Sequence, residues 1–517
     1  MKFLYHLNDK QTIFEAVPEN NKEYSGYRGE ALHIPVTLTK KKLIFDYRVK
    51  KPLHPDIVAL ICLTAFYPYI KYSVTFPFPV SENFKNALNK NILPQFEVMH
   101  DKKLDDQSKI IKYQPTHEIN ITNVDHQLKP YSGKNTVIAF GGGIDSTMLS
   151  LILPEIPIIH CVDRPKYFKT MNEWISKLPN KKYIHGCNIR EISDPFGYTG
   201  WANSYLVPLL LSSELDIKNI LNGDTIDMSR VLVGSKYRWM LNYIPYSPYT
   251  HNHWVMAYRL IGIELVSPLI GCSELMTSKI VYKHNLCKDV LFCQRDNGKQ
   301  CYKCDKCFRK MLQFAYHGNT QKTSYWNQFP YDSTLINWPL FHGHVYMECI
   351  NNLKNLPYEC YKYTDDLKSI KTKQFNKIYP ESFDYLPEDI KWLIISRLTD
   401  HFQIMNESET SIVKNQNMLP PRKFSPDMKI IVKNIWDKFT QTEKMLENNS
   451  LTSKLDDKSR LKLQILKSVS NNKITNTNEQ MVIETKQAPN YVNNNKINQK
   501  YVILCKNAQM HSHKKKL

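Results

Sequence analysis

The residues best suited to chemistry stand at positions 137–147, where VIAFGGGIDST runs from an apolar stretch into three glycines and then into polar residues. Consecutive glycines allow positive φ angles and let the backbone approach a ligand that a Cβ atom would block. If a helix begins here, backbone N–H groups converge at the positive end of its dipole, which suits a phosphate. The predicted phosphate loop comprises Ala139, Phe140, Gly141, Gly142, Gly143, Ile144, Asp145, Ser146 and Thr147.

Two common nucleotide-binding patterns are absent from this segment. A Walker loop would end in Gly-Lys-Ser or Gly-Lys-Thr, and a dinucleotide fingerprint would space its glycines differently. The remaining alternative is a glycine turn that only links a strand to a helix. The hydroxyls of Ser146 and Thr147 and the carboxylate of Asp145 could cap the helix or reach phosphate oxygens and a magnesium ion.

A second group of reactive residues is a cysteine cluster near the middle of the chain. Cys293, Cys301, Cys304 and Cys307 lie within fifteen residues, and four thiolates can close a tetrahedral site with no position left for water, so we expect structural Zn²⁺. An iron–sulfur cluster is the competitor, but ferredoxin runs continue to a Cys followed by Pro, and this one does not. The isolated cysteines are interpreted as packing or surface residues: Cys62, Cys161, Cys187, Cys272, Cys287, Cys349, Cys360 and Cys505.

Alternating strands and helices must position these two motifs. The pattern predicts strands at 136–140, 156–163, 182–187 and 217–222, with helices at 146–153, 167–178 and 201–215. Such alternation predicts an α/β fold with a doubly wound, mainly parallel sheet, which we take to have five strands. Ligands bind such sheets where loops leave the C-terminal ends of the strands.

The chain divides into four predicted segments. Residues 1–133 form an N-terminal α+β domain, with strands at 31–38, 42–49 and 71–78 and helices at 55–67 and 80–93. Residues 134–317 form the central domain, and residues 318–440 form a C-terminal helical appendage. Residues 441–517 are a basic, Asn- and Lys-rich tail that should hold little fixed structure.

The chain of 517 residues carries a formal charge of +20, but much of the excess is in the tail, with 14 Lys and Arg against 6 Asp and Glu. Nucleic acid is therefore a candidate partner through the tail, although it is not favoured. The N-terminus lacks a secretory signal, and the apolar stretch at 57–70 is too short for a membrane helix. We expect a cytoplasmic protein without membrane attachment.

The phosphate loop resembles the signature of the PP-loop ATP pyrophosphatases, which is a serine, two glycines, any residue, then Asp-Ser. Here Gly141 stands in place of the serine. The loop followed by the cysteine cluster looks like 7-cyano-7-deazaguanine synthase and its relatives, over about residues 134–312. Further correspondences are Ala202-Asn203, residues 222–227, residues 266–270 and Arg309, whereas Met228-Ser229-Arg230-Val231 replaces the family's substrate segment.

The resemblance implies a HUP/PP-loop type of sheet with a zinc clasp, and an AMP-forming ligase that uses ATP and Mg²⁺. ATP would adenylate a small-molecule carboxylate, amide or ring carbonyl, pyrophosphate would leave, and an amine or ammonia would displace AMP. The candidate catalytic residues are Asp145, Ser146 and Asp227. The candidate substrate residues are Asn203, Asp224 and Arg230, which could instead be a helix cap, a turn former and a surface charge.

Two other functions stay open. A tRNA-thiolating enzyme would use a catalytic thiol pair near the loop, but Cys161 and Cys187 are single and poorly placed along the chain to supply one. A non-catalytic ATP-binding protein would use residues 318–517 to hold a partner. The chain could also form a homodimer.

Overall fold

The computed structural model describes residues 1–28, 34–70, 73–89, 120–163, 168–194, 203–233, 236–239, 258–291, 293, 301–302, 304–318, 339–353, 356 and 371–415. Met1–Asn449 form one compact unit, which contains the predicted N-terminal, central and appendage segments. The predicted tail at 441–517 lies outside the described residues.

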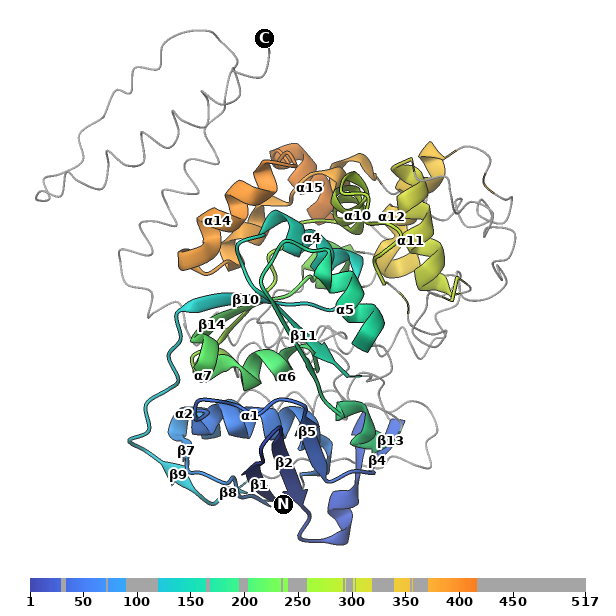
Figure 1. The fold of residues 1–517 in the computed structure, drawn as a ribbon. Coiled ribbons are helices and arrows are strands. Elements are labelled where there is room, and N and C mark those ends of the chain that lie inside the picture. Colours follow the sequence, from blue (N-terminus) through green and yellow to red (C-terminus); the bar gives the residue numbers. More distant parts are fainter. Residues whose placement is uncertain are drawn as a thin grey trace, which may run out of the picture. The chain divides into compact units, whose positions relative to one another are not determined.

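A five-stranded parallel sheet forms the centre of the unit (Figure 1). Its strands are β10 (Asn135–Ala139), β11 (Ile158–Val162), β12 (Lys182–Gly186), β14 (Ile217–Leu221) and β17 (Glu264–Val266). They lie in the order β12-β11-β10-β14-β17, and every neighbouring pair is parallel. The chain moves outward from β10 in one direction and then returns to the other side of β10. The strand order therefore reverses between β10 and β14, which is where such sheets bind ligands.

Helices cover both faces of this sheet, because its strands are apolar on both sides. Alternate residues of β10 point into different cores, with Val137 in one and Ile138 in the other. The Ile138 core includes α4 (Ile144–Ile152), α5 (Phe168–Ser176) and α10 (Glu274–Lys283). The Val137 core includes α6 (Asn203–Leu210), which is followed by α7 (Ser212–Leu215). One helix was predicted at 201–215, but the chain forms two.

The N-terminal segment packs onto the α6 face. Helix α1 (Pro55–Phe66) begins after the N-cap His54 and is buried from Asp56 onward, and it contacts α6 within the Val137 core. The strands β1 (Lys2–Leu7), β2 (Thr12–Val17) and β5 (Lys42–Phe45) form one antiparallel sheet. Strand β4 (Ile34–Leu38) pairs on one side with β3 (Ser25–Arg28) and on the other with β13 (Ser193–Asp194), which comes from the central segment.

Shorter elements complete the N-terminal and central segments. They are η1 (Asn21–Tyr24), η2 (Tyr67–Tyr69), β6 (Ser73–Val74), β7 (Val80–Ser81), α2 (Glu82–Ala87), β8 (Asn120–Ile121), β9 (Val124–Asp125), η5 (Ile189–Glu191), α8 (Ile226–Ser229), β15 (Arg230–Val233) and β16 (Lys236–Trp239).

The C-terminal part of the unit is helical where the structure describes it. Its elements are α11 (Asp305–Tyr316), α12 (Pro339–Asn352), η8 (Lys373–Asn376), η9 (Pro380–Tyr385), α14 (Glu388–Thr399) and α15 (Glu407–Asn415). Ile394 and Leu398 of α14 are fully buried in the Ile138 core. In the described ranges, no helix has the length and apolar character needed to cross a membrane.

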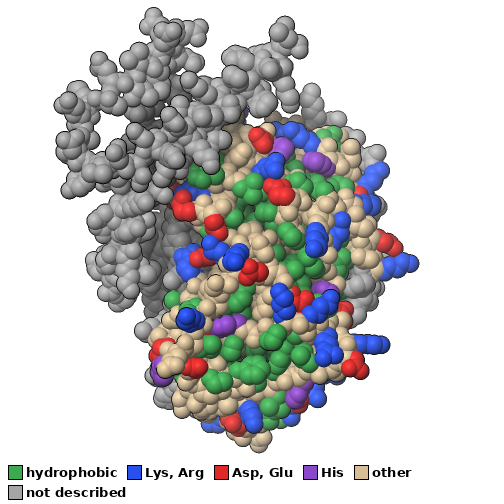
Figure 2. All heavy atoms as spheres, turned by 60° about the vertical axis from the view of Figure 1, so that its left-hand side comes forward, with side chains coloured by type: hydrophobic (Ala, Val, Ile, Leu, Met, Phe, Trp, Pro, Cys, Tyr) green, Lys and Arg blue, Asp and Glu red, His purple; other side chains and the backbone are tan. Residues whose placement is uncertain are grey.

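Basic side chains do not gather in one place on the face drawn in Figure 2. Lys and Arg are interspersed there with Asp and Glu. On this face the positive charge that lies outside the tail is therefore dispersed and does not form a cluster.

Candidate functional site

The predicted phosphate loop follows β10 at the point where the strand order reverses. The strand is extended by a hydrogen bond from Phe140 N to Ile159 O (2.8 Å), and His160 Nδ1 donates to Phe140 O (2.6 Å). Gly142 then takes a φ of +76°, a backbone conformation that favours glycine. Gly143 is the N-cap of α4. The turn after β10 therefore depends on Gly142.

The start of α4 presents a row of unbonded backbone N–H groups. Among the described residues, no hydrogen-bond acceptor is recorded for the N–H groups of residues 141–146. Gly141 is exposed and Gly143 is half-buried. The hydroxyls of Ser146 and Thr147 both donate to Gly143 O, at 3.2 and 2.7 Å. Because unpaired N–H groups need a solvent or ligand acceptor, this row is available to an anion.

The loop after β14 lies directly against the start of α4. A Cβ atom on Gly223 would come within 2.7 Å of Ser146 N and 3.0 Å of Asp145 C. Asn222 N donates to Val266 O (2.8 Å), which ties this loop to β17. Asp224 follows and accepts from Ser267 Oγ (3.4 Å). Residues 222–224 therefore form the second wall of the site.

Asp145 links the loop to a network of charged and polar side chains. Its Oδ1 accepts from Thr277 Oγ1 (2.6 Å) and lies 3.8 Å from Lys310 Nζ. Lys310 Nζ is also 3.0 Å from Glu274 Oε2. Glu274 accepts from Arg309 Nε (2.8 Å) as well. Side chains of α10 and α11 therefore surround the carboxylate of Asp145.

Burial raises the pKa of Asp145. The charge of Lys310 and the hydrogen bond from Thr277 act in the opposite direction, whereas the charge of Glu274 raises the pKa further. The Asp145 side chain nevertheless keeps 28% of its surface exposed, against 2% for Lys310. Because the carboxylate of Asp145 is only partly hydrated, a nearby cation stabilises its charged form more than it would stabilise a fully hydrated carboxylate.

Asp227 is placed differently from Asp145. Its side chain is fully buried, with Oδ2 accepting from Glu274 N (2.8 Å) and Oδ1 lying 2.6 Å from His344 Nε2. The His344 ring stacks on Phe375 with 3.9 Å between centroids. Asp227 therefore joins α8, α10 and α12 inside the protein, and its carboxylate positions the first turn of α10.

The other two predicted substrate residues begin elements of the fold. Asn203 is the first residue of α6 and Arg230 is the first residue of β15. The side chains of both lie outside the described residues.

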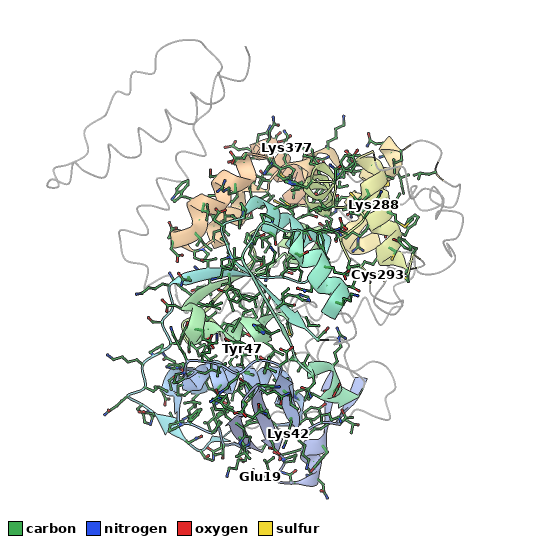
Figure 3. The ribbon with its side chains drawn as sticks, in the orientation of Figure 1. Glu19, Lys42, Tyr47, Lys288, Cys293 and Lys377 are labelled. Carbon is green, nitrogen blue, oxygen red and sulfur yellow. The ribbon has the colours of Figure 1, made fainter. Side chains whose placement is uncertain are left out.

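The four clustered cysteines converge and can hold a metal ion, with all four Sγ atoms within 4.8 Å of one another. The Sγ separations are 3.5 Å for Cys293 and Cys301, 3.7 Å for Cys293 and Cys304, and 3.8 Å for Cys301 and Cys307. Tetrahedral zinc with bonds of about 2.3 Å requires sulfur–sulfur edges of about 3.8 Å. Cys304 is the N-cap of α11, and Figure 3 shows Cys293 beside this helix. The donor set fits a closed four-sulfur centre at the start of α11.

The expectation that Cys161 and Cys187 are single is wrong. Their Sγ atoms lie 3.3 Å apart, because Cys161 on β11 pairs in parallel register with His185 and Cys187 comes two residues later. Cys161 is the penultimate residue of β11 and Cys187 directly follows β12, so both lie at the same edge of the sheet as the phosphate loop. The hydrogen bond with the Cys187 thiol, together with burial, raises the pKa of Cys161.

Several side chains of the network were not among the predicted site residues. They are Glu274, Thr277, Lys310 and His344. The one available signal was the spacing of Lys306, between the last two clustered cysteines, and Lys310, which places both lysines on one face of a helix.

Residues 253–417 match the model of a family described as a family of unknown function (DUF6395). No curated protein and no solved structure matches the chain. The matched region contains the cysteine cluster, Glu274 and Lys310, whereas Asp145 and the glycine loop precede it. The network around Asp145 therefore joins residues of the matched region to residues outside it.

Proposed function

We propose that this chain is an AMP-forming, ATP-dependent ligase of the PP-loop type, with a HUP-type sheet. The observation that carries the proposal is the row of unbonded N–H groups at residues 141–146, located where the strand order reverses. Backbone N–H groups at a helix start bind phosphates, and the sheet reversal is where α/β folds bind nucleotides. The five parallel strands are also in keeping with the sheet that the family resemblance implies.

In this proposal the protein acts by positioning and by charge neutralisation. The N–H groups of Gly141 to Ser146 would hold the departing pyrophosphate. Asp145 and Asp224, which follow β10 and β14 and retain solvent access, would hold a magnesium ion. The predicted catalytic residue Asp227 would not take part, because its carboxylate is buried against His344 and the Glu274 amide.

A substrate oxygen would attack the α-phosphorus of ATP, and the pyrophosphate would leave. An amine or ammonia would then displace AMP from the activated carbon. The four cysteines would hold Zn²⁺ in a structural role, since a closed four-sulfur set leaves no open position.

The test is pyrophosphate release by the purified full chain with ATP and Mg²⁺, in the presence of a small-molecule pool or of an RNA pool. We expect release that depends on the small-molecule pool, and its loss in Asp145→Asn. The matched control is Asp9→Asn, because Asp9 is a fully exposed carboxylate of the N-terminal segment. Tight ATP binding without release under any condition would favour a non-catalytic nucleotide-binding protein instead.

Sulfur transfer to RNA is the second candidate, and the contact between Cys161 and Cys187 favours it. The terminal sulfur of a persulfide on one cysteine would displace AMP from the adenylated base. The other thiol would then attack the first cysteine sulfur, forming a disulfide and leaving sulfur on the base. A sulfur donor and a thiol reductant would restore the pair. Because the raised pKa of Cys161 keeps its thiol protonated, we rank this function second.

RNA-dependent pyrophosphate release would separate this candidate from the ligase. If it operates, Cys161→Ser should keep pyrophosphate release while losing sulfur incorporation into RNA. A ligase should release pyrophosphate without RNA in both the wild type and this variant.

A further inference from the structure

Helix α11 brings two lysines to the phosphate loop from one face. Lys306 and Lys310 are four positions apart in α11, a spacing that places side chains one above the other. Lys310 Nζ lies 3.8 Å from Asp145 Oδ1, so this face of α11 is turned toward the residue that starts α4. The charge of Lys306 also acts on Asp145.

Three cations of α11 lie near Asp145 and Glu274, and two of them form recorded ion pairs. Asp145 and Glu274 are matched by Lys310 and Arg309, which lie 3.0 and 2.8 Å from Glu274 Oε2. Lys306 is a third cation. The residue is exposed, although burial of its amino group and the charges of Lys310 and Arg309 lower its pKa. Within the part of the chain that the structure describes, Lys306 has no recorded ion pair.

The phosphate loop lacks a side-chain hydroxyl that is present in the signature it resembles. Gly141 stands where the PP-loop signature has a serine, and the hydroxyls of Ser146 and Thr147 are both directed to Gly143 O. Backbone N–H groups alone would have to bind a polyphosphate that carries several negative charges. A cation from another element would complete such a site.

We propose that Lys306 supplies this cation, contacting the pyrophosphate portion of ATP from α11 while the N–H groups of Gly141 to Ser146 contact it from α4. The inference rests on the proposed ATP site. It assigns Lys306 as a binding residue, with Lys310 as a positioning residue that holds α11 against Asp145.

The metal centre would then orient the binding residue as well as stabilise the fold. Cys304 and Cys307 stand on either side of Lys306, so a metal ion bound by both thiolates would fix the turn that carries it. Metal removal is therefore expected to weaken pyrophosphate binding.

The test is isothermal titration calorimetry of the metal-loaded full chain with three probes: Mg·ATP, Mg·pyrophosphate and AMP. We expect Lys306→Gln to weaken binding of ATP and pyrophosphate by about 10- to 100-fold, as loss of a charge-assisted hydrogen bond does. AMP should bind equally to variant and wild type, because it lacks the groups that Lys306 contacts. Lys306→Arg should restore most of the affinity. The thermal midpoint should not change, since the side chain is exposed.

Lys283→Gln is the matched control, because Lys283 is an exposed lysine at the end of α10 and its loss changes the net charge equally. Wild-type protein that binds neither ATP nor pyrophosphate would refute the proposed function itself. Wild-type binding with an unchanged Lys306→Gln affinity would refute only the role of Lys306. Equal losses for AMP and ATP, or equal losses in the Lys283 control, would also overturn that role.

Discussion

At the scale of single residues, the glycines of the site differ in what surrounds them. Gly223 has the backbone of α4 within 2.7 Å of the place a Cβ would occupy, whereas Gly141 has only Ser146 Oγ, at 4.0 Å. Gly142 needs a positive φ. The substitution of glycine for serine at position 141 is therefore not forced by lack of space.

We therefore expect an alanine substitution to change the free energy of unfolding by different amounts at Gly223 and at Gly141. Gly223→Ala should lower the free energy of unfolding by about 1–3 kcal/mol, because the methyl group must push the backbone of residues 145–146 aside. Gly141→Ala, as the control, should change it by less than about 1 kcal/mol, since a compatible Gly-to-Ala change is mildly stabilising. Urea unfolding followed by circular dichroism measures both. Equal stabilities would contradict the close contact between the two loops.

His317, in the residue after α11, predicts a pH dependence. Burial lowers its pKa to about 4, while its Nε2 lies 3.0 Å from Ser278 Oγ and from Leu275 O. Between the ordinary value near 6.5 and about 4, the unfolded chain binds more protons, so stability is full above this window and falls as the pH falls through it.

Replacing His317 by Gln removes the titration but keeps an N–H donor for Leu275 O. The wild type should lose about 2 kcal/mol more than the variant between about pH 7 and about pH 4.5. Denaturant unfolding at the two pH values gives the difference. Parallel losses in the two proteins would show that this ring does not titrate as expected.

At the scale of elements, α11 connects the cysteine centre to the loop. It begins directly after its N-cap, Cys304, and carries Arg309, Lys310 and Gln313, the last of which donates to Glu274 Oε2 (2.7 Å). Loss of order in the first turn of α11 would leave Glu274, a nearly fully buried carboxylate, without its cations. Such a group is strongly destabilising when unpaired.

Cys304→Ser should therefore act mainly by destabilising the surrounding domain, and less by changing the site in protein that stays folded. We expect the thermal midpoint to fall by about 5–10 °C, because a bound structural metal contributes folding free energy. A chelator should lower the midpoint of the wild type in the same way and have little further effect on the variant. Normal thermal stability in a variant that has lost its metal would contradict a structural role.

Elements with strong local signals were predictable, and those defined by pairing were not. Helix α1 was predicted within one residue of its observed end, because Pro55 starts it and an apolar run continues it. Strands β1 and β2 were missed. Strand β1 buries its residues in no clean alternation, whereas β2 alternates but is only six residues long. The four cysteines were found from their spacing, whereas the contact of Cys161 with Cys187 depends on strand register, which single positions do not reveal.

At the scale of the whole unit, the N-terminal segment and the central sheet share one core. Helix α1 is buried against α6, Tyr47 (Figure 3) donates its hydroxyl to Glu214 Oε2 at 2.8 Å, and Asn188 Nδ2 donates to Lys42 O at 3.0 Å. The chain topology therefore changes at the predicted domain boundary, residue 133, but the hydrophobic core continues across it.

A fragment of residues 134–449 should consequently fail to fold cooperatively, because the apolar face of α6 would be exposed to water. The control is a fragment of residues 1–449, which corresponds to the whole compact unit. Size-exclusion chromatography and thermal unfolding compare the two. A soluble 134–449 fragment with a sharp transition would show that the central sheet does not need the N-terminal segment.

The pairing of β4 with β13 also governs when the protein can fold on the ribosome. The hydrogen bond from Thr39 Oγ1 to Glu191 O joins positions 152 residues apart, and α1 must wait a similar length of chain for α6. At about 5–20 residues per second, β4 and the largely apolar α1 would stay without these partners for roughly 8–30 s of translation. A nascent chain of this kind is a natural client for chaperones that shield apolar helices near the exit tunnel.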